Sequence, residues 1–170
     1  MSRGLAACLA TVTLTAGCGG LAEPPVREET GVIQVVNDGD TIRLEDGRRI
    51  RLVQIDAPEE SECYGRAATA ALLLTLSRGT RIELESDAAL DDRDEHGRLL
   101  RTVFVLGINV NLAQVRAGAA APYFYRGARG RYADKLLDAA ERARAHRLGL
   151  WAACPGTLLR PERGIDTGPA

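Results

Sequence analysis

Lysine, aromatic residues and net charge are all scarce in this 170-residue sequence. Lys135 is the only lysine, and the 22 lysine and arginine residues nearly balance 23 acidic ones, which leaves a formal net charge of −1. No overall positive field therefore attracts nucleic acid, and an anionic substrate would have to be held by local arginines. The four cysteines show no CxxC or Cys/His spacing, so nothing indicates a zinc site.

The N-terminus has the composition of an export signal. Arg3 precedes an uncharged stretch, residues 4–20, that is too short and too rich in small residues for a comfortable membrane span. The segment "LTAGC" ending at Cys18 resembles a bacterial lipobox, in which cleavage leaves a lipidated N-terminal cysteine. We therefore expect a lipoprotein-type signal peptide over residues 1–18, with Cys18 as the lipidated residue and the protein exported to the cell envelope. The alternative is an ordinary signal peptide cut nearby, which would make the protein secreted and Cys18 incidental.

The remaining chain divides into one domain and two flanking segments. Residues 19–30 are polar with a Pro-Pro pair and are typical of a tether, and residues 155–170 have the composition of a flexible tail. The domain then covers residues 31–154, and we expect it to be a monomer. In an exported domain, Cys63 and Cys154 are the obvious disulfide pair, although two unpaired buried cysteines remain the alternative.

The order of periodic segments predicts an α+β fold that is mainly β. Alternating β-branched residues and short turns predict strands over residues 31–37, 41–46, 48–58, 80–86 and 99–107. Alanine-rich or amphipathic stretches that end near glycine predict helices over residues 61–79, 109–118 and 130–149. Five short strands with about three helices favour a Greek-key barrel of the oligonucleotide-binding (OB) type.

Three carboxylates lie at strand ends in the first half of the domain. Asp40 begins one predicted strand and Asp56 ends another, so the two would share a site if these ends adjoin; Asp38 could support them from an outer position. Carboxylates without a nearby imidazole or thiol suit Ca²⁺ or Mg²⁺. The alternative for Asp38 and Asp40 is ordinary turn chemistry, because "NDGDT" is also a good Asx-turn sequence.

Glu59, Arg51 and Arg98 complete a possible phosphodiesterase site. Glu59 could activate a water molecule, or it could cap the following helix. Arg51 and Arg98 could bind a phosphoryl group whose oxygens gather charge in the transition state, although each alone could equally be a surface ion-pair partner.

Six motifs in this chain occur in the order and approximate spacing of the staphylococcal nuclease (thermonuclease) family, which the sequence resembles over about residues 31–154. They are "DGDT" at 38–41, "RLVQIDAPE" at 51–59, "CYG" at 63–65, "DEHGR" at 94–98, "YFY" at 123–125 and "GLW" at 149–151. The resemblance implies a Ca²⁺-dependent phosphodiesterase on an OB barrel that cleaves DNA and RNA to leave 3′-phosphates.

The resemblance also implies a role for each matching residue. Asp40 and Asp56 would be the calcium carboxylates, the backbone carbonyl of Ala57 would be a further ligand, and Asp38 would lie in the outer shell. Arg51 and Arg98 would bind the scissile phosphate, and Glu59 would orient or deprotonate the attacking water.

Tyr123 and Tyr125 match a tyrosine pair that packs against base and phosphate, although one or both could pack into the core with Phe124 pointing elsewhere. Two positions depart from the family pattern. Ala57 replaces a threonine, and His96 replaces a tyrosine near a phosphate, so contact there would become weaker or pH-dependent. His96 could also be an exposed loop residue with no catalytic duty. The competing function is a catalytically inactive barrel of the same family that binds nucleic acid or a protein partner.

Overall fold

The computed structural model describes residues 29–169. The predicted signal peptide over residues 1–18, Cys18 and nearly all of the predicted tether lie outside the described residues. Within residues 29–169, no helix is both long enough and apolar enough to cross a membrane.

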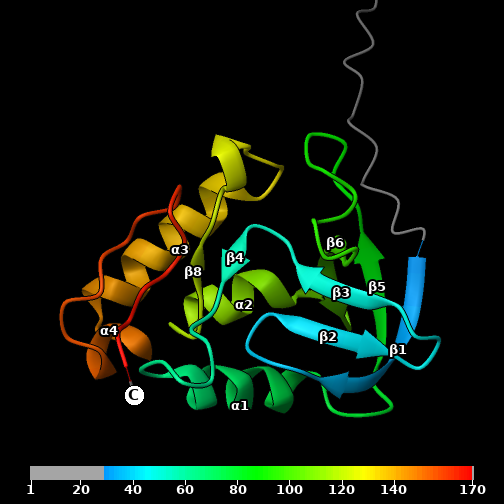
Figure 1. Cartoon of the computed structure of the whole chain (residues 1–170), viewed down its shortest axis with the longest axis horizontal. Helices are drawn as coiled ribbons and strands as arrows, with labels where there is room; N and C mark the ends of the chain where they lie inside the picture. The colour runs from blue at the N-terminus through cyan, green and yellow to red at the C-terminus, as the bar shows by residue number, and fades with distance from the viewer. Residues whose placement is uncertain (1–28, 170) are drawn as a thin grey trace, which may run out of the picture.

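Five strands form a closed barrel, which confirms the predicted fold (Figure 1). They are β1 (Glu29–Val36), β2 (Thr41–Leu44), β3 (Arg49–Leu52), β5 (Arg81–Glu85) and β6 (Leu99–Val105). β1 pairs antiparallel with β2 and β5, β2 with β3, and β5 with β6. Parallel pairing of β3 with β6 closes the barrel, with Ile50 opposite Leu99.

Alternation along the strands explains why the barrel forms. In β2, Ile42 and Leu44 are fully buried while Arg43 between them is exposed; in β3, Ile50 and Leu52 are buried and Arg51 between them faces outward, partly exposed. Strands of period two place one face in the core and the other toward solvent. The same alternation that builds the core therefore puts Arg51 on the outer surface of the barrel.

The long strand predicted over residues 48–58 is two strands in the structure. β3 ends at Leu52, and β4 (Ile55–Asp56) pairs with β8 (Ala121–Pro122) in a separate small sheet. The break lies at Gln54, whose φ of 63° is in the left-handed region that a strand cannot continue through. This turn carries Asp56 away from the barrel sheet and toward the segment that contains the tyrosine pair. The remaining short strand, β7 (Ile108–Asn109), pairs with the end of β6.

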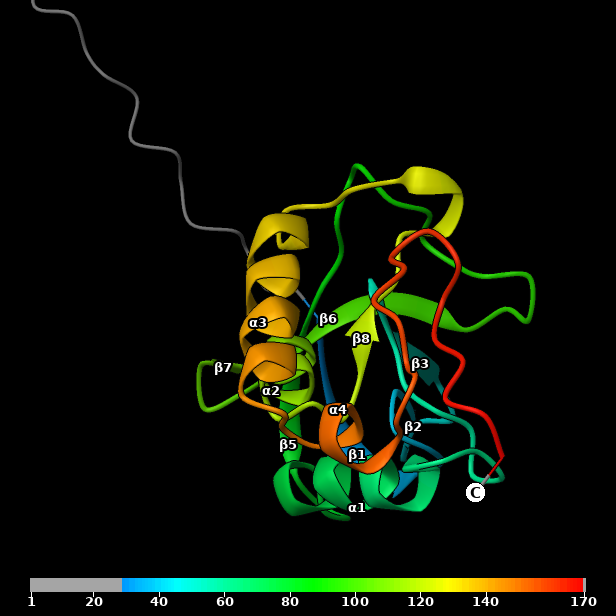
Figure 2. The same ribbon diagram turned by 90° about the vertical axis from the view of Figure 1, so that its left-hand side faces the viewer.

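Residues 29–169 form four helices and one 3₁₀ turn: α1 (Gly65–Thr75), α2 (Val110–Arg116), α3 (Ala133–Ala145), α4 (Leu150–Ala153) and η1 (Tyr125–Gly127). The helices lie to one side of the barrel and below one end, and leave the β1, β2 and β3 side uncovered (Figures 1 and 2). α1 lies below one end of the barrel, and α3 packs beside α2 and β8. The helix predicted over residues 130–149 ends at Ala145, and the single turn of α4 follows a bend at Gly149, whose φ is 55°.

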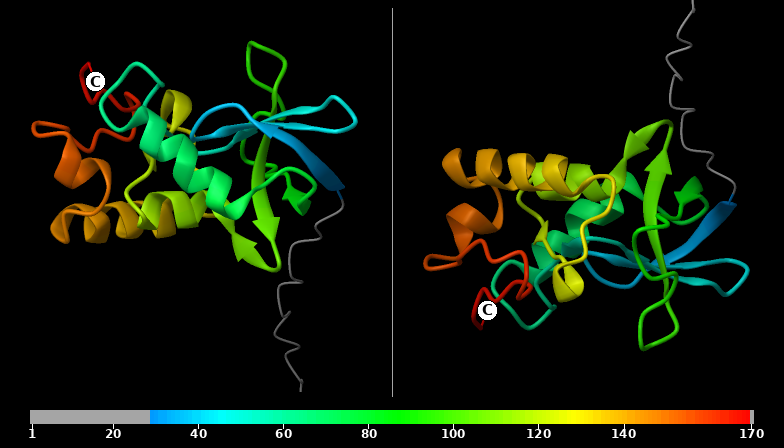
Figure 3. Two further views of the ribbon diagram at one scale, coloured as in Figure 1. Left: turned by 90° about the horizontal axis from the view of Figure 1, so that it is seen from below. Right: turned by 90° about the horizontal axis from the view of Figure 1, so that it is seen from above.

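The structure forms the disulfide expected between Cys63 and Cys154, with their Cα atoms 5.9 Å apart. It joins the turn before α1 to the end of α4. The segment expected to be a flexible tail follows Cys154 and lies against the domain, where Figure 3 shows it ending beside the loop that precedes α1.

Candidate active site

The "DGD" turn that holds Asp40 is fixed by a hydrogen bond within the turn, by a side chain of α2 and by close packing on Ala57. The Asp40 amide donates to Asp38 Oδ1 at 3.0 Å, so Asp38 forms the Asx turn that was its alternative reading. The buried side chain of Gln114 in α2 donates to the carbonyl of Gly39 at 3.0 Å. Gly39 is needed here, because a Cβ would lie 2.5 Å from the Cβ of Ala57. Close packing of this turn on Ala57 therefore brings Asp40 next to Asp56.

Asp40 and Asp56 converge on one cationic group, the guanidinium of Arg51. Arg51 Nη1 lies 2.8 Å from Asp40 Oδ2, and Nη2 lies 2.8 Å from Asp56 Oδ1. Nη1 also donates to the carbonyl of Ile55 at 2.8 Å. The Ala57 amide donates to Asp40 Oδ2 at 2.8 Å, which holds the carboxylate in place. The structure therefore brings together the two carboxylates and the arginine predicted to act together.

Burial dominates the electrostatics of Asp40. Its side chain is almost completely excluded from water, and this desolvation raises its pKa from 3.8 to about 7, even though the Arg51 charge acts to lower the pKa. The nearby Asp38 and Asp56 charges also act to raise it. Asp40 is buried near other carboxylates, so the single positive charge of Arg51 does not fully offset the cost of ionising it.

Arg98 is held at the wall of the neighbouring pocket by two groups. Its Nε donates to Asp94 Oδ2 at 2.6 Å, and its Nη1 donates to Thr41 Oγ1 at 3.1 Å. Thr41 Oγ1 also donates to Asp40 Oδ1 at 3.0 Å. One hydroxyl therefore links the predicted phosphate-binding arginine to the predicted cation-binding carboxylate.

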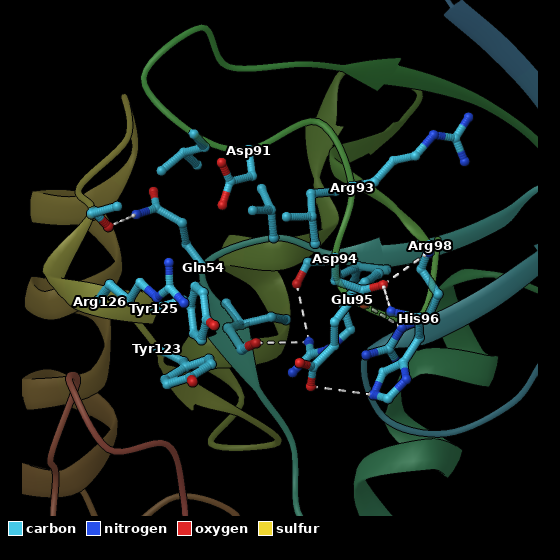
Figure 4. A pocket seen from close by; sticks show the side chains of 17 residues that line it. Gln54, Asp91, Arg93, Asp94, Glu95, His96, Arg98, Tyr123, Tyr125 and Arg126 are labelled. Carbon is cyan, nitrogen blue, oxygen red and sulfur yellow. Dashed lines mark hydrogen bonds and ion pairs between the residues drawn. The ribbon is translucent and has the colours of Figure 1, made fainter.

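A pocket of about 340 Å³ lies beside these groups, and Figure 4 shows its polar lining. Of the predicted site residues, it is lined by Arg51, His96, Arg98, Tyr123 and Tyr125. The two tyrosines lie on one side, and Arg98 and His96 on the other. A cavity with apolar rings facing guanidinium groups matches a nucleotide, which has a base to stack and a phosphate to bind.

The tyrosine motif divides between the pocket and the core. Phe124 is buried, whereas Tyr125 is about half exposed and Tyr123 is partly exposed. The two tyrosine rings meet edge to face with centroids 6.4 Å apart. Partial burial and the nearby Asp56 charge raise the pKa of Tyr123, so its hydroxyl stays protonated and able to donate a hydrogen bond.

Glu59 and His96 are less constrained. Glu59 is exposed on the turn after Pro58, and its amide donates to Glu62 Oε2 at 2.8 Å. The N-cap residue of α1 is Tyr64, and in the part of the chain that the structure describes no side-chain hydrogen bond caps this helix, so the alternative capping role for Glu59 is not what the structure shows. His96 is exposed on the 94–98 loop, with Nε2 3.7 Å from a carboxylate oxygen of Glu95.

Sequence reasoning missed several contacts in and beside the pocket, and three of them bear on the site. Arg126 lies with its guanidinium carbon 5.0 Å from the ring centroid of Tyr125, and Gln54 lines the pocket while donating to the carbonyl of Ala128 at 3.2 Å. The third is the amide of Ile165, which donates to Asp56 Oδ2 at 2.8 Å. Arg126 follows the tyrosine motif directly, so its position was a usable signal. Gln54 and Ile165 carried none, because their roles depend on backbone conformation.

The donor chemistry of the site fits a hard divalent cation. Within residues 29–169, no cluster of three or more His, Cys, Asp or Glu side chains is placed so that it could hold a metal ion. A cation here would therefore use Asp40 and Asp56 with the backbone carbonyl of Ala57 and water, a set of oxygen donors that suits Ca²⁺ or Mg²⁺. In this structure both carboxylates are paired with Arg51, so a cation that binds them would take over contacts that the guanidinium now makes.

The family described as "Staphylococcal nuclease homologue" matches residues 49–153, more than half of the chain. The chain belongs to the staphylococcal nuclease family. The predicted family is thereby confirmed, and membership makes the chain a nuclease, a hydrolase of phosphodiester bonds.

Curated relatives of this staphylococcal nuclease family member cover most of its length. An "Uncharacterized endonuclease" of Escherichia coli O157:H7 is 39% identical over 127 residues, which are 72% of this chain and 76% of the relative. "Protein ParB" of Escherichia coli is 35% identical over 145 residues, 78% and 77% of the two chains. A "Micrococcal nuclease" of Shigella flexneri is 30% identical over 136 residues, 72% and 73% of the two chains.

Proposed function

We propose that this nuclease is calcium-dependent and cleaves DNA, RNA or both to leave 3′-phosphates. The observation that supports the proposal is the convergence of Asp40 and Asp56 on one cationic group beside a pocket lined by Arg98 and two tyrosines. Endonuclease and micrococcal nuclease relatives support a nucleic-acid substrate. When bound, calcium would supply positive charge that stabilises the phosphoryl oxygens in the transition state.

The side chains divide the remaining work. Arg98, held by Asp94 and Thr41, presents a fixed guanidinium to the phosphate and neutralises charge on its equatorial oxygens. Arg51 also lines the pocket, so its guanidinium is within reach of both the carboxylates and a phosphate there. Glu59, exposed two residues after Ala57 in the chain, orients or deprotonates the attacking water. Tyr123 and Tyr125 stack on the base or pack against a phosphate.

The experiment is hydrolysis of denatured DNA and of RNA by the chain lacking its predicted export segment. Each substrate is incubated with Ca²⁺, with Mg²⁺ and with a chelator, and the ends are typed by their susceptibility to a 3′-phosphatase. Calcium-dependent loss of polymer with 3′-phosphate ends is the expected result. Binding of nucleic acid without cleavage by the folded protein would support the inactive binding module instead.

We also propose that the protein is exported and anchored to the cell envelope through lipid on Cys18. The support is the uncharged N-terminal stretch and the "LTAGC" segment. Labelling cells with an alkyne fatty acid tests the proposal, with Cys18→Ala as the variant and Cys8→Ala as the matched control. Label on the control chain and none on Cys18→Ala is expected; equal label on both would contradict lipidation at Cys18.

A further inference from the structure

Residues 161–168, which we call the C-terminal strap, cross the surface next to the candidate active site. At one end, the amide of Phe124 donates to the carbonyl of Pro161 at 2.6 Å. At the other end, the amide of Cys63 donates to the carbonyl of Gly168 at 2.9 Å, and Thr167 Oγ1 donates to the carbonyl of Cys63 at 2.8 Å. In Figures 1 and 2 the strap, drawn in red, runs past β8 toward the loop before α1.

The disulfide ties both ends of this segment to one point of the domain. Residues 155–169 leave from Cys154, and the strap returns to the backbone of Cys63, the partner of Cys154 in the disulfide. A segment closed in this way loses less conformational entropy when it contacts the surface between its ends. The strap is therefore built to keep its middle residues in a fixed place.

The middle of the strap contacts Asp56, a candidate cation ligand. Asp56 Oδ1 faces Arg51 Nη2 at 2.8 Å, on the side shared with Asp40. Asp56 Oδ2 instead accepts a hydrogen bond from the amide of Ile165 at 2.8 Å. The two oxygens of Asp56 thus have separate partners: Oδ1 faces the guanidinium of Arg51, and Oδ2 is held by the strap.

We propose that the C-terminal strap is a positioning element, which orients Asp56 so that its Oδ1 can bind a cation together with Asp40. The inference rests on the proposed calcium dependence. A backbone amide on the outer oxygen of a ligating carboxylate restricts its rotation and lowers the cost of ordering it on binding. A carboxylate on a two-residue strand at the surface has few other constraints, since β4 covers only residues 55 and 56.

Two glycines of the strap provide a test with a matched control. Gly164 and Gly168 both have a φ of +73°, so alanine is forced to an unfavourable positive φ at either position. A Cβ at Gly164 would lie 2.8 Å from Asp56 Oδ2, whereas a Cβ at Gly168 would meet nothing within 4 Å. Gly164→Ala therefore disturbs the contact with Asp56, and Gly168→Ala reproduces only the backbone strain.

The experiment measures calcium affinity by isothermal titration calorimetry on the chain lacking its predicted export segment. We expect Gly164→Ala to bind calcium about tenfold more weakly than the natural chain, and Gly168→Ala to stay within about twofold of it. A chain that lacks residues 162–170 should show the same loss as Gly164→Ala. Thermal unfolding without calcium, compared between the two alanine variants, separates this effect from a general loss of stability.

The outcomes distinguish the strap from the proposed cofactor. If the natural chain binds no calcium, the calcium proposal fails and this inference fails with it. If the natural chain binds calcium and both Gly164→Ala and the shortened chain bind it equally well, only the positioning role is overturned. Tighter binding by either of them would also overturn it, because the strap would then compete with the cation for Asp56.

Discussion

The buried carboxylate of Asp40 should make the calcium-free protein less stable as the pH rises. In the folded protein its proton is retained up to a pKa of about 7, whereas in the unfolded chain it is released near the ordinary value of 3.8. Between these values the unfolded chain binds fewer protons than the folded one, so the free energy of unfolding falls with increasing pH. The effect of Asp40 begins near pH 4 and is complete by about pH 8.

The magnitude follows from the two pKa values. One pKa unit corresponds to about 1.4 kcal/mol, so the contribution of Asp40 to the free energy of unfolding should decrease by up to about 4 kcal/mol between pH 4 and pH 8. That is a large part of the total stability of a typical domain. Desolvation causes the loss, because the Asp40 side chain is 8% exposed and the Arg51 guanidinium, 2.8 Å away, offsets only part of the cost of ionising it.

The assay is urea unfolding in a chelator at a series of pH values, for the natural chain and for Asp40→Asn. Asparagine cannot ionise, so the difference between the two profiles isolates Asp40 while other titrating groups cancel. The natural chain should lose stability relative to Asp40→Asn across this range. Asp134→Asn, at an exposed position of α3, is the control and should leave the profile unchanged. Parallel profiles for the natural chain and Asp40→Asn would refute the reasoning and show that pairing with Arg51 outweighs burial.

Three further predictions concern the active site and the disulfide. Arg98→Ala should lower kcat by about a hundredfold to a thousandfold in a variant that still folds, because its charge serves the transition state; a folded variant with full activity would remove Arg98 from the site. Gly65→Ala should lower the free energy of unfolding by about 1–3 kcal/mol and reduce activity, because its Cβ would lie 1.8 Å from the carbonyl oxygen of Glu59. Urea unfolding and a nuclease assay test this, and an unchanged midpoint together with unchanged activity would contradict it. Replacing Cys63 and Cys154 together by alanine should cost about 4–5 kcal/mol for a sequence separation of 91 residues, and equal urea midpoints with the natural chain would contradict that value.

Strand alternation and turn residues were sufficient to predict the barrel. Ile42, Leu44, Ile50 and Leu52 alternate with charged residues, and this period of two is a local property that any window of the chain displays. The break at Gln54 could not be predicted, because a positive φ at a non-glycine residue has no local signature and is imposed by the surrounding fold.

The sequence by itself determined the residue types of the candidate site: two carboxylates at strand ends, the arginines and the tyrosine pair. Motif spacing identified them, because the six motifs stand in the order and approximate spacing of the family that the sequence resembles. Only the tertiary structure decided their contacts. Arg51 lies between Asp40 and Asp56 because the "DGD" turn packs on Ala57, and the amide of Ile165 contacts Asp56 across 109 residues of sequence. Every residue except proline has the same backbone N–H group, so the side-chain pattern of the sequence does not show which amide will bind a carboxylate. That depends on which segment the folded chain brings next to the carboxylate.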